Sequence, residues 1–200
     1  MYIPKNFLLT DQNEISEFMQ RYSFATLVSM DAELPVATHL PFIVAKRGEE
    51  LVLTAHFARA NMQWENLING KVLVIFAEPH AYISTKNYEL DLNVPTWNYF
   101  AVHAYGDARL LPDVQDTLSV LEATILNYEA DYKVKWDAFP EDYKLKMIKG
   151  IVAFEICVTD LQAKKKLSQN RTDQEKKQII DTLAQSDASH ERAVAEYMDK

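Results

Sequence analysis

Residues 94–106, VPTWNYFAVHAYG, place an indole, an amide, a phenol and an imidazole in one short run that is typical of a strand. Alternate side chains of a strand share a face, so Asn98 would lie on one face and Trp97, Tyr99 and His103 on the other. Half-buried strands also favour aromatic residues. The alternative is therefore an amphipathic strand at a sheet edge, with Asn98 solvated and the rings in the core.

A second candidate is residues 56–61, HFARAN, which follow one predicted strand directly and precede a helical turn. The planar guanidinium of Arg59 suits a phosphate or a carboxylate, because it donates two parallel hydrogen bonds to either group. Backbone N–H groups at the start of the following helix could add donors. The alternative is a surface arginine beside a helix-capping Asn61.

The single local basic cluster is residues 164–171, KKKLSQNR. Three consecutive lysines usually form a solvated face. The following run of hydrogen-bonding side chains could instead hold a phosphate or the polar edge of a ring, or contact a nucleic-acid backbone without reading its sequence.

Several common sites have no signature in this chain. No G-x-G-x-x-G, Walker A or G-x-S-x-G pattern occurs, and the five histidines show no metal-ligand spacing such as H-E-x-x-H. A core or hydrogen-bonded role is the default for each histidine. One cysteine, Cys157, excludes an internal disulfide and a multi-cysteine zinc site, and its apolar surroundings predict a buried, inert thiol.

Composition predicts a globular protein of ordinary hydrophobicity: 200 residues, 48% hydrophobic, with a formal net charge of −8 and a pI near 5.1. So acidic a chain would need a local basic patch to contact nucleic acid. Neither an 18-residue apolar run nor a signal-peptide pattern is present, so we expect a soluble, cytoplasmic protein without a membrane span.

Hydrophobic periodicity predicts a mainly antiparallel β (α+β) chain, because consecutive strands are joined by short turns. The strand at 71–77 reads as buried on both faces, and Tyr143 and Met147 should point inward from their helix. The expected elements are helices at 13–22, 62–67, 114–132, 140–149, 176–184 and 189–200, and strands at 24–30, 34–45, 51–55, 71–77, 94–111 and 151–161. Pro41 indicates an edge or a bulge within the second strand.

Six motifs, taken in order, resemble the PaiB family of FMN-binding negative transcriptional regulators. They are MYIP at 1–4, THLPF at 38–42, HFARAN at 56–61 with Trp64, PHAYIS at 79–84, VPTWNY at 94–99 with Val102 and His103, and KLSQNR at 166–171. Each motif alone is a weak signal, but the ordered series covers most of the chain and is highly specific.

The resemblance implies an FMN-binding split β-barrel with peripheral helices, spanning residues 1–171 and forming a homodimer, with residues 172–200 as a helical extension. By analogy with related barrels, Arg59 and Thr54 would bind the FMN phosphate, with Asn61 and His39 as further contacts. Other segments would close the site from the same or the partner subunit. The full set of expected cofactor contacts is His39, Thr54, His56, Arg59, Ala60, Asn61, Trp97, Asn98, Tyr99, Lys166, Ser168, Gln169 and Arg171.

Three functions remain open at this point. The first is a dimeric repressor, whose only obvious DNA contacts would be residues 164–166, Arg171, Lys176 and Lys177. The second is an FMN-dependent oxidoreductase acting on a small molecule, with Tyr99, His103 or His56 as proton donor. The third is a small-molecule sensor that lacks FMN. It is motivated by Ala55, Met62, Glu78 and Ala163, which stand where the family usually has glycine or proline.

Overall fold

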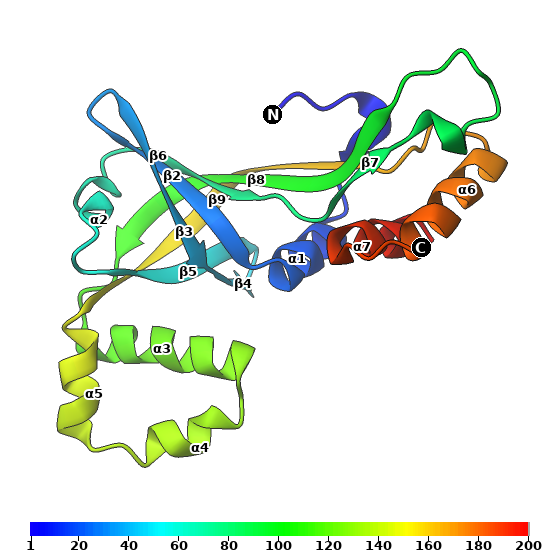
Figure 1. Ribbon diagram of the computed structural model, residues 1–200. Helices are drawn as coiled ribbons and strands as arrows, with labels where there is room; N and C mark the ends of the chain where they lie inside the picture. The colour runs from blue at the N-terminus through cyan, green and yellow to red at the C-terminus, as the bar shows by residue number, and fades with distance from the viewer. Residues whose placement is uncertain (200) are drawn as a thin grey trace. The chain divides into compact units, whose positions relative to one another are not determined.

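The computed structural model describes residues 1–199 and consists mainly of antiparallel strands with several helices (Figure 1). The helical elements are η1 (Lys5–Phe7), α1 (Gln12–Arg21), α2 (Gln63–Asn66), η2 (Thr85–Asn87), α3 (Val114–Tyr128), α4 (Tyr132–Asp137), α5 (Glu141–Ile148), α6 (Asp173–Ala184) and α7 (Ser189–Met198). The strands are β1 (Leu8–Leu9), β2 (Phe24–Asp31), β3 (Leu34–Pro41), β4 (Ile43–Arg47), β5 (Glu50–Ala58), β6 (Lys71–Phe76), β7 (His80–Ile83), β8 (Thr96–Leu110) and β9 (Ile151–Lys166).

The chain divides into two compact units. Unit 1 contains Met1–Ile15, Phe76–His103 and residues 162–199; unit 2 contains Ser16–Ile75 and Ala104–Leu161. Strands β8 and β9 are long enough to belong to both units.

Unit 2 is an open antiparallel sheet with the strand order β3-β2-β6-β8-β9-β5-β4. The predicted turn after residue 30 joins β2 to β3, and Ala32 adopts a φ of 52° there. Buried apolar side chains such as Leu27, Leu53, Phe57 and Phe154 form its core, and the Phe57 and Phe154 rings stack with centroids 4.8 Å apart. Helix α3 lies against β4 and β5.

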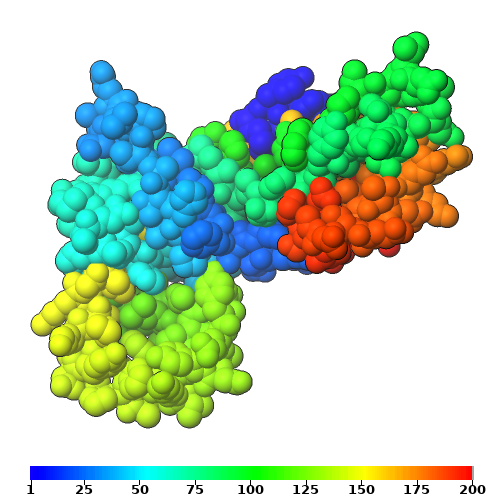
Figure 2. All heavy atoms as spheres, viewed as in Figure 1, coloured from blue at the N-terminus to red at the C-terminus, as the bar shows by residue number. Residues whose placement is uncertain are grey.

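Unit 1 pairs β7 with β8 and β1 with β9. Helices α6 and α7 pack against each other, and α7 also packs on β7. In the space-filling view these two helices, orange and red, form a continuous surface with the green strand-and-loop region of the same unit (Figure 2). Phe100, Ile179 and Val194 are buried in this packing.

Most predicted elements are confirmed, but several details of the prediction are wrong. The predicted strand at 34–45 is broken at Phe42 into β3 and β4, which occupy opposite ends of the strand order. The predicted helix at 114–132 ends at Tyr128, and a separate α4 follows. Strand β9 runs five residues past the predicted end at 161, which places the three lysines on a strand.

Three burial predictions also fail. Strand β6 alternates between buried and half-buried residues, so only one of its faces is fully covered. Tyr143 and Met147 on α5 do not point inward, because both are more than 40% exposed. Cys157 is half-buried, and burial together with the nearby Glu50 carboxylate raises the pKa of its thiol, so the thiol stays protonated near neutral pH. The last residue of the predicted tail helix lies outside the described residues.

Candidate functional site

Arg59 follows the end of β5 in unit 2, and its side chain is held by backbone carbonyls. Its Nε donates to the carbonyl of Lys149 and its Nη2 to the carbonyl of Ile151, both at 2.8 Å. Its backbone N–H donates to the Gly150 carbonyl at 2.8 Å. Within residues 1–199 no carboxylate pairs with this guanidinium, so its orientation is fixed while its charge is not neutralised.

Arg59 lines a cavity of about 520 Å³ in unit 2. Lys149 is a second cationic residue on the wall, and no acidic residue among residues 1–199 lines the cavity. The remaining wall is mainly apolar and includes Trp64, Leu110, Val114, Leu145, Ile148 and Val152. A volume of this size and a few convergent polar groups are typical of small-molecule sites.

An amide network holds the backbone that follows Arg59. The side chain of Gln63 accepts from Thr38 Oγ1 at 2.6 Å and donates to Ser29 Oγ at 3.0 Å and to the Val36 carbonyl at 3.2 Å. Asn61 donates to Thr38 Oγ1 at 2.9 Å and accepts from the Gln63 backbone N–H at 3.1 Å. Gln63 is not among the predicted contacts, because nothing in local sequence marks an amide that is buried only by tertiary packing.

The other predicted phosphate contacts of unit 2 do not join Arg59. Thr54 lines a different cavity of about 470 Å³ with Arg47, Arg109 and Glu155. His39 is exposed on β3 and stacks against Phe24, with ring centroids 6.3 Å apart. Ala60 is exposed.

The two histidines considered as proton donors are neutral at pH 7. Burial lowers the pKa of His56. The pKa of His103 is also lowered, mainly by burial and to a smaller extent by the positive charge of the N-terminal ammonium group. Each pKa therefore moves further below 7, and neither imidazole carries the extra proton that a general acid would donate.

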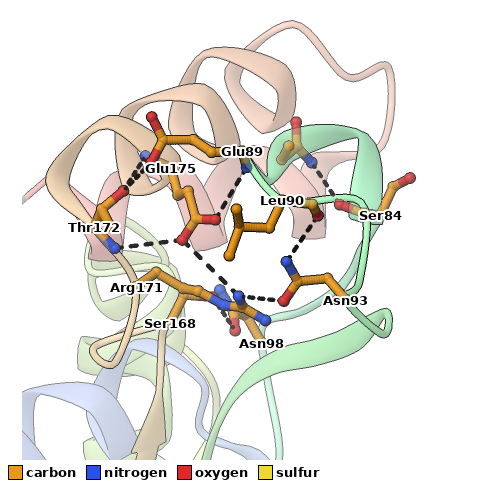
Figure 3. A network of polar contacts seen from close by, with 10 residues as sticks. Ser84, Glu89, Leu90, Asn93, Asn98, Ser168, Arg171, Thr172 and Glu175 are labelled. Carbon is orange, nitrogen blue, oxygen red and sulfur yellow. Dashed lines mark hydrogen bonds and ion pairs between the residues drawn. The ribbon is translucent and has the colours of Figure 1, made fainter.

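In unit 1, Asn98 and the segment at 166–171 form a polar network (Figure 3). Asn98 is fully buried; its Oδ1 accepts from Ser168 Oγ at 3.0 Å and its Nδ2 donates to Met198 Sδ at 3.4 Å. The predicted alternation of β8 is confirmed, because Asn98 is buried while neighbouring Trp97 is half exposed. Asn98 thus links β8 to both the 166–171 segment and α7.

The rest of this segment is also tied to the protein itself. Arg171 donates to Asn93 Oδ1 at 2.8 Å, lies 3.7 Å from the Tyr88 ring centroid and has Glu175 at 3.9 Å (Figure 3). Gln169 accepts from the Leu167 backbone N–H at 2.8 Å and donates to the Lys165 carbonyl. These contacts order the entry to α6, where Thr172 and Glu175 form a capping box.

The basic cluster is not a free cationic surface. Lys165 pairs with Glu14 at 2.6 Å and Lys176 with Asp173 at 2.7 Å, and Lys164 is buried. Most of the candidate DNA contacts are therefore engaged within the chain. Among residues 1–199 no group of histidine, cysteine and carboxylate side chains is arranged to hold a metal ion, and no helix is long and apolar enough to cross a membrane.

Two solved structures share this fold at low sequence identity. The flavocytochrome Anf3 from Azotobacter vinelandii has a TM-score of 0.64 at 14% identity, covering 82% of this chain and 72% of its own. A FAD and heme binding protein from Mycobacterium smegmatis has a TM-score of 0.61 at 14% identity, covering 79% and 72%. This chain thus shares the split-barrel fold of these two proteins.

The family follows from sequence comparison. The family model described as "Putative FMN-binding domain" matches residues 1–160. The protein named "Protease synthase and sporulation protein PAI 2" from Bacillus subtilis (strain 168) is 41% identical over 202 residues, covering 100% of this chain and 97% of its own. The chain belongs to the PaiB family of this FMN-binding domain, as its six motifs predicted.

Proposed function

We propose that this protein binds FMN, with the phosphate at Arg59 and the ring system in the adjoining cavity. The observation that carries the proposal is the Arg59 guanidinium, which is held by the Lys149 and Ile151 carbonyls but is not neutralised by a carboxylate. Family membership supplies the identity of the ligand.

The residues present fit the chemistry of FMN. A phosphate needs fixed cationic donors, which Arg59 offers and which Lys149 can supplement. The apolar isoalloxazine ring needs an apolar wall, which residues such as Leu110 and Val152 provide. When bound, FMN would supply redox chemistry; this chain would position the cofactor and keep water from one side of it. His56 and Asn61, which lie in unit 2 with Arg59, remain candidate contacts.

Titration of the purified protein with FMN, followed by flavin fluorescence, tests the proposal. We expect Arg59→Ala to weaken FMN binding by about 10- to 100-fold, the range of a lost charge-assisted hydrogen bond. Riboflavin lacks the phosphate, so its weaker binding should be the same in the variant and the native protein. Arg192→Ala is the matched control, because Arg192 also donates to a backbone carbonyl, that of Ser186, and lies in unit 1.

Because Arg59 also stabilises its own loop, each variant should first show native circular dichroism and a native unfolding midpoint. Arg59→Lys keeps the positive charge but loses the two parallel N–H donors of the guanidinium. Lys149→Ala removes the second cation but keeps the backbone carbonyl of residue 149, which accepts from Arg59. The proposal is overturned if the native protein does not bind FMN, or if Arg59→Ala binds FMN as the native protein does.

We further propose that the FMN-bound protein is a homodimeric regulator that acts through a partner protein. The Bacillus subtilis relative carries the name "Protease synthase and sporulation protein PAI 2", which links it to a cellular programme and not to one reaction. Indirect action is favoured because Lys165, Arg171 and Lys176 are paired internally and the chain carries a net charge of −8.

Light scattering and gel shifts test this second proposal. We expect a mass of twice 23.0 kDa and no shift of DNA fragments by the protein alone, even at low salt. A monomer would contradict the dimer. A direct shift that weakens steeply as salt is added would contradict indirect action.

A further inference from the structure

Strand β9 extends beyond the predicted end and carries three consecutive lysines in unit 1. Because side chains alternate along a strand, Lys164 and Lys166 share one face and Lys165 lies on the other. Lys165 has an acidic partner, Glu14, at 2.6 Å. Lys164 and Lys166 have no acidic partner among residues 1–199.

Lys164 is a buried cation that lacks a carboxylate partner. Its side chain belongs to a residue only 8% exposed, and its Nζ donates to the backbone carbonyl of Tyr2 at 3.4 Å. The ammonium group also lies 5.1 Å from the Tyr99 ring centroid and 5.8 Å from that of Tyr2. Within residues 1–199 no carboxylate lies within ion-pair distance of it.

Lys166, two residues further along the strand, is half-buried and also lacks a carboxylate partner among residues 1–199. Its Nζ donates to Thr96 Oγ1 and to the Trp97 carbonyl and lies 5.9 Å from the Phe7 ring centroid. The pKa of Lys166 is lowered, mainly by burial and to a smaller extent by the positive charges of Lys164 and Arg171.

A bound anion would compensate for the charges of these two neighbouring lysines. A buried charge is costly unless it is paired, and the rings of Tyr2, Tyr99 and Phe7 compensate for it only partly. The chain has an excess of acidic residues, yet folding places none of them against Lys164 or Lys166. An anion from solution would supply the counter-charge.

We propose that Lys164 and Lys166 form an anion-binding site for the phosphate or carboxylate group of a small molecule with an aromatic or apolar body. The two ammonium groups would donate to the anion, and the rings of Tyr2, Phe7 and Tyr99 would contact the body. Lys164 was not among the expected cofactor contacts. The site lies in unit 1, whereas Arg59 lies in unit 2, so the proposal does not depend on FMN binding at Arg59.

The test is nuclear magnetic resonance of the lysine ¹³Cε–Hε groups of the full-length protein, titrated with inorganic phosphate. We expect the Lys164 and Lys166 signals to shift together and the pKa of Lys166 to rise when phosphate is bound, because an anion favours the charged ammonium. Lys165 is the internal control, since Glu14 already neutralises it.

Calorimetry with variants provides a second readout. Lys164→Met and Lys166→Met should each weaken phosphate binding at least tenfold, whereas Lys165→Met should leave it unchanged. Methionine has nearly the same shape as lysine, so we expect all three variants to fold. If one of them does not, the NMR titration of the native protein still tests the proposal. The proposal is overturned if Lys164 and Lys166 do not respond at phosphate concentrations well above the roughly millimolar Kd expected for a simple anion, or if Lys165→Met weakens binding equally.

Two sources of the anion are separated by adding flavins. If FMN displaces phosphate and riboflavin does not, and Lys164→Met weakens FMN binding, the cofactor phosphate occupies this site. If phosphate still binds to the FMN-saturated protein, the ligand is a different anionic molecule. A failed FMN titration at Arg59 would leave the phosphate titration unaffected, so the two proposals fail independently.

Discussion

Gly106→Ala is expected to destabilise the protein by about 3 kcal/mol, because β8 and β9 approach too closely at this position for a side chain. An added Cβ would lie 2.3 Å from the Cys157 carbonyl oxygen and 2.6 Å from Ile156 Cγ2. Neither neighbour can move freely, since one is backbone and the other belongs to a fully buried side chain. The strands would have to separate, and packing along both would be lost.

The measurement is the free energy of unfolding in urea, followed by circular dichroism. Gly70→Ala is the matched control: an added Cβ there has no neighbour within 4 Å, so we expect a change within about 0.5 kcal/mol. Because β8 and β9 also supply Leu110 and Val152 to the Arg59 cavity, FMN affinity should fall in Gly106→Ala. Equal stability of the two variants would contradict the close approach.

The double variant Arg47→Ala/Arg109→Ala is expected to reverse the pH dependence that Glu155 contributes to stability. Glu155 is 5% exposed, and its two oxygens pair with Arg47 at 2.7 Å and Arg109 at 2.6 Å. Burial alone would raise the pKa of Glu155, but the hydrogen bonds from the two arginines outweigh burial and leave the pKa below its ordinary value.

The signs of the two slopes follow from linkage. In the native protein the depressed pKa means that Glu155 stabilises the fold above its unfolded pKa of about 4.3, and that this stability is lost as pH falls through the lower folded pKa. In the double variant only burial remains, so the pKa rises and the contribution of Glu155 grows as pH falls from 7. Leaving the carboxylate buried and unpaired should cost about 3 kcal/mol at pH 7.

Urea unfolding at several pH values between 3 and 7 measures both slopes. Lys71→Ala is the control, because the Lys71–Asp107 pair has the same 2.6 Å separation but both side chains are more than half exposed. It should change stability by no more than about 0.5 kcal/mol, without a reversal of slope. If the double variant keeps the native pH dependence, the two arginines do not determine the ionisation of Glu155.

The sequence by itself determined the family, the antiparallel fold class and most of the elements. These features depend on local signals: periodicity marks α1 by Ile15, Phe18 and Met19, and short turns such as the one at Ala32 join neighbouring strands. The alternation along β8, with Asn98 buried and Trp97 exposed, was also readable, because the period of a strand is two residues.

Only the tertiary structure decided which residues meet. Arg59 and Thr54 are five residues apart on one segment, yet they line different cavities, because Lys149 after α5 and Ile151 at the start of β9, some 90 residues away, hold Arg59. The same reason explains Gln63, Glu155 and Lys164. Whether a polar side chain is buried, paired or left without a counter-charge depends on the strands placed beside it, and local sequence does not record those neighbours.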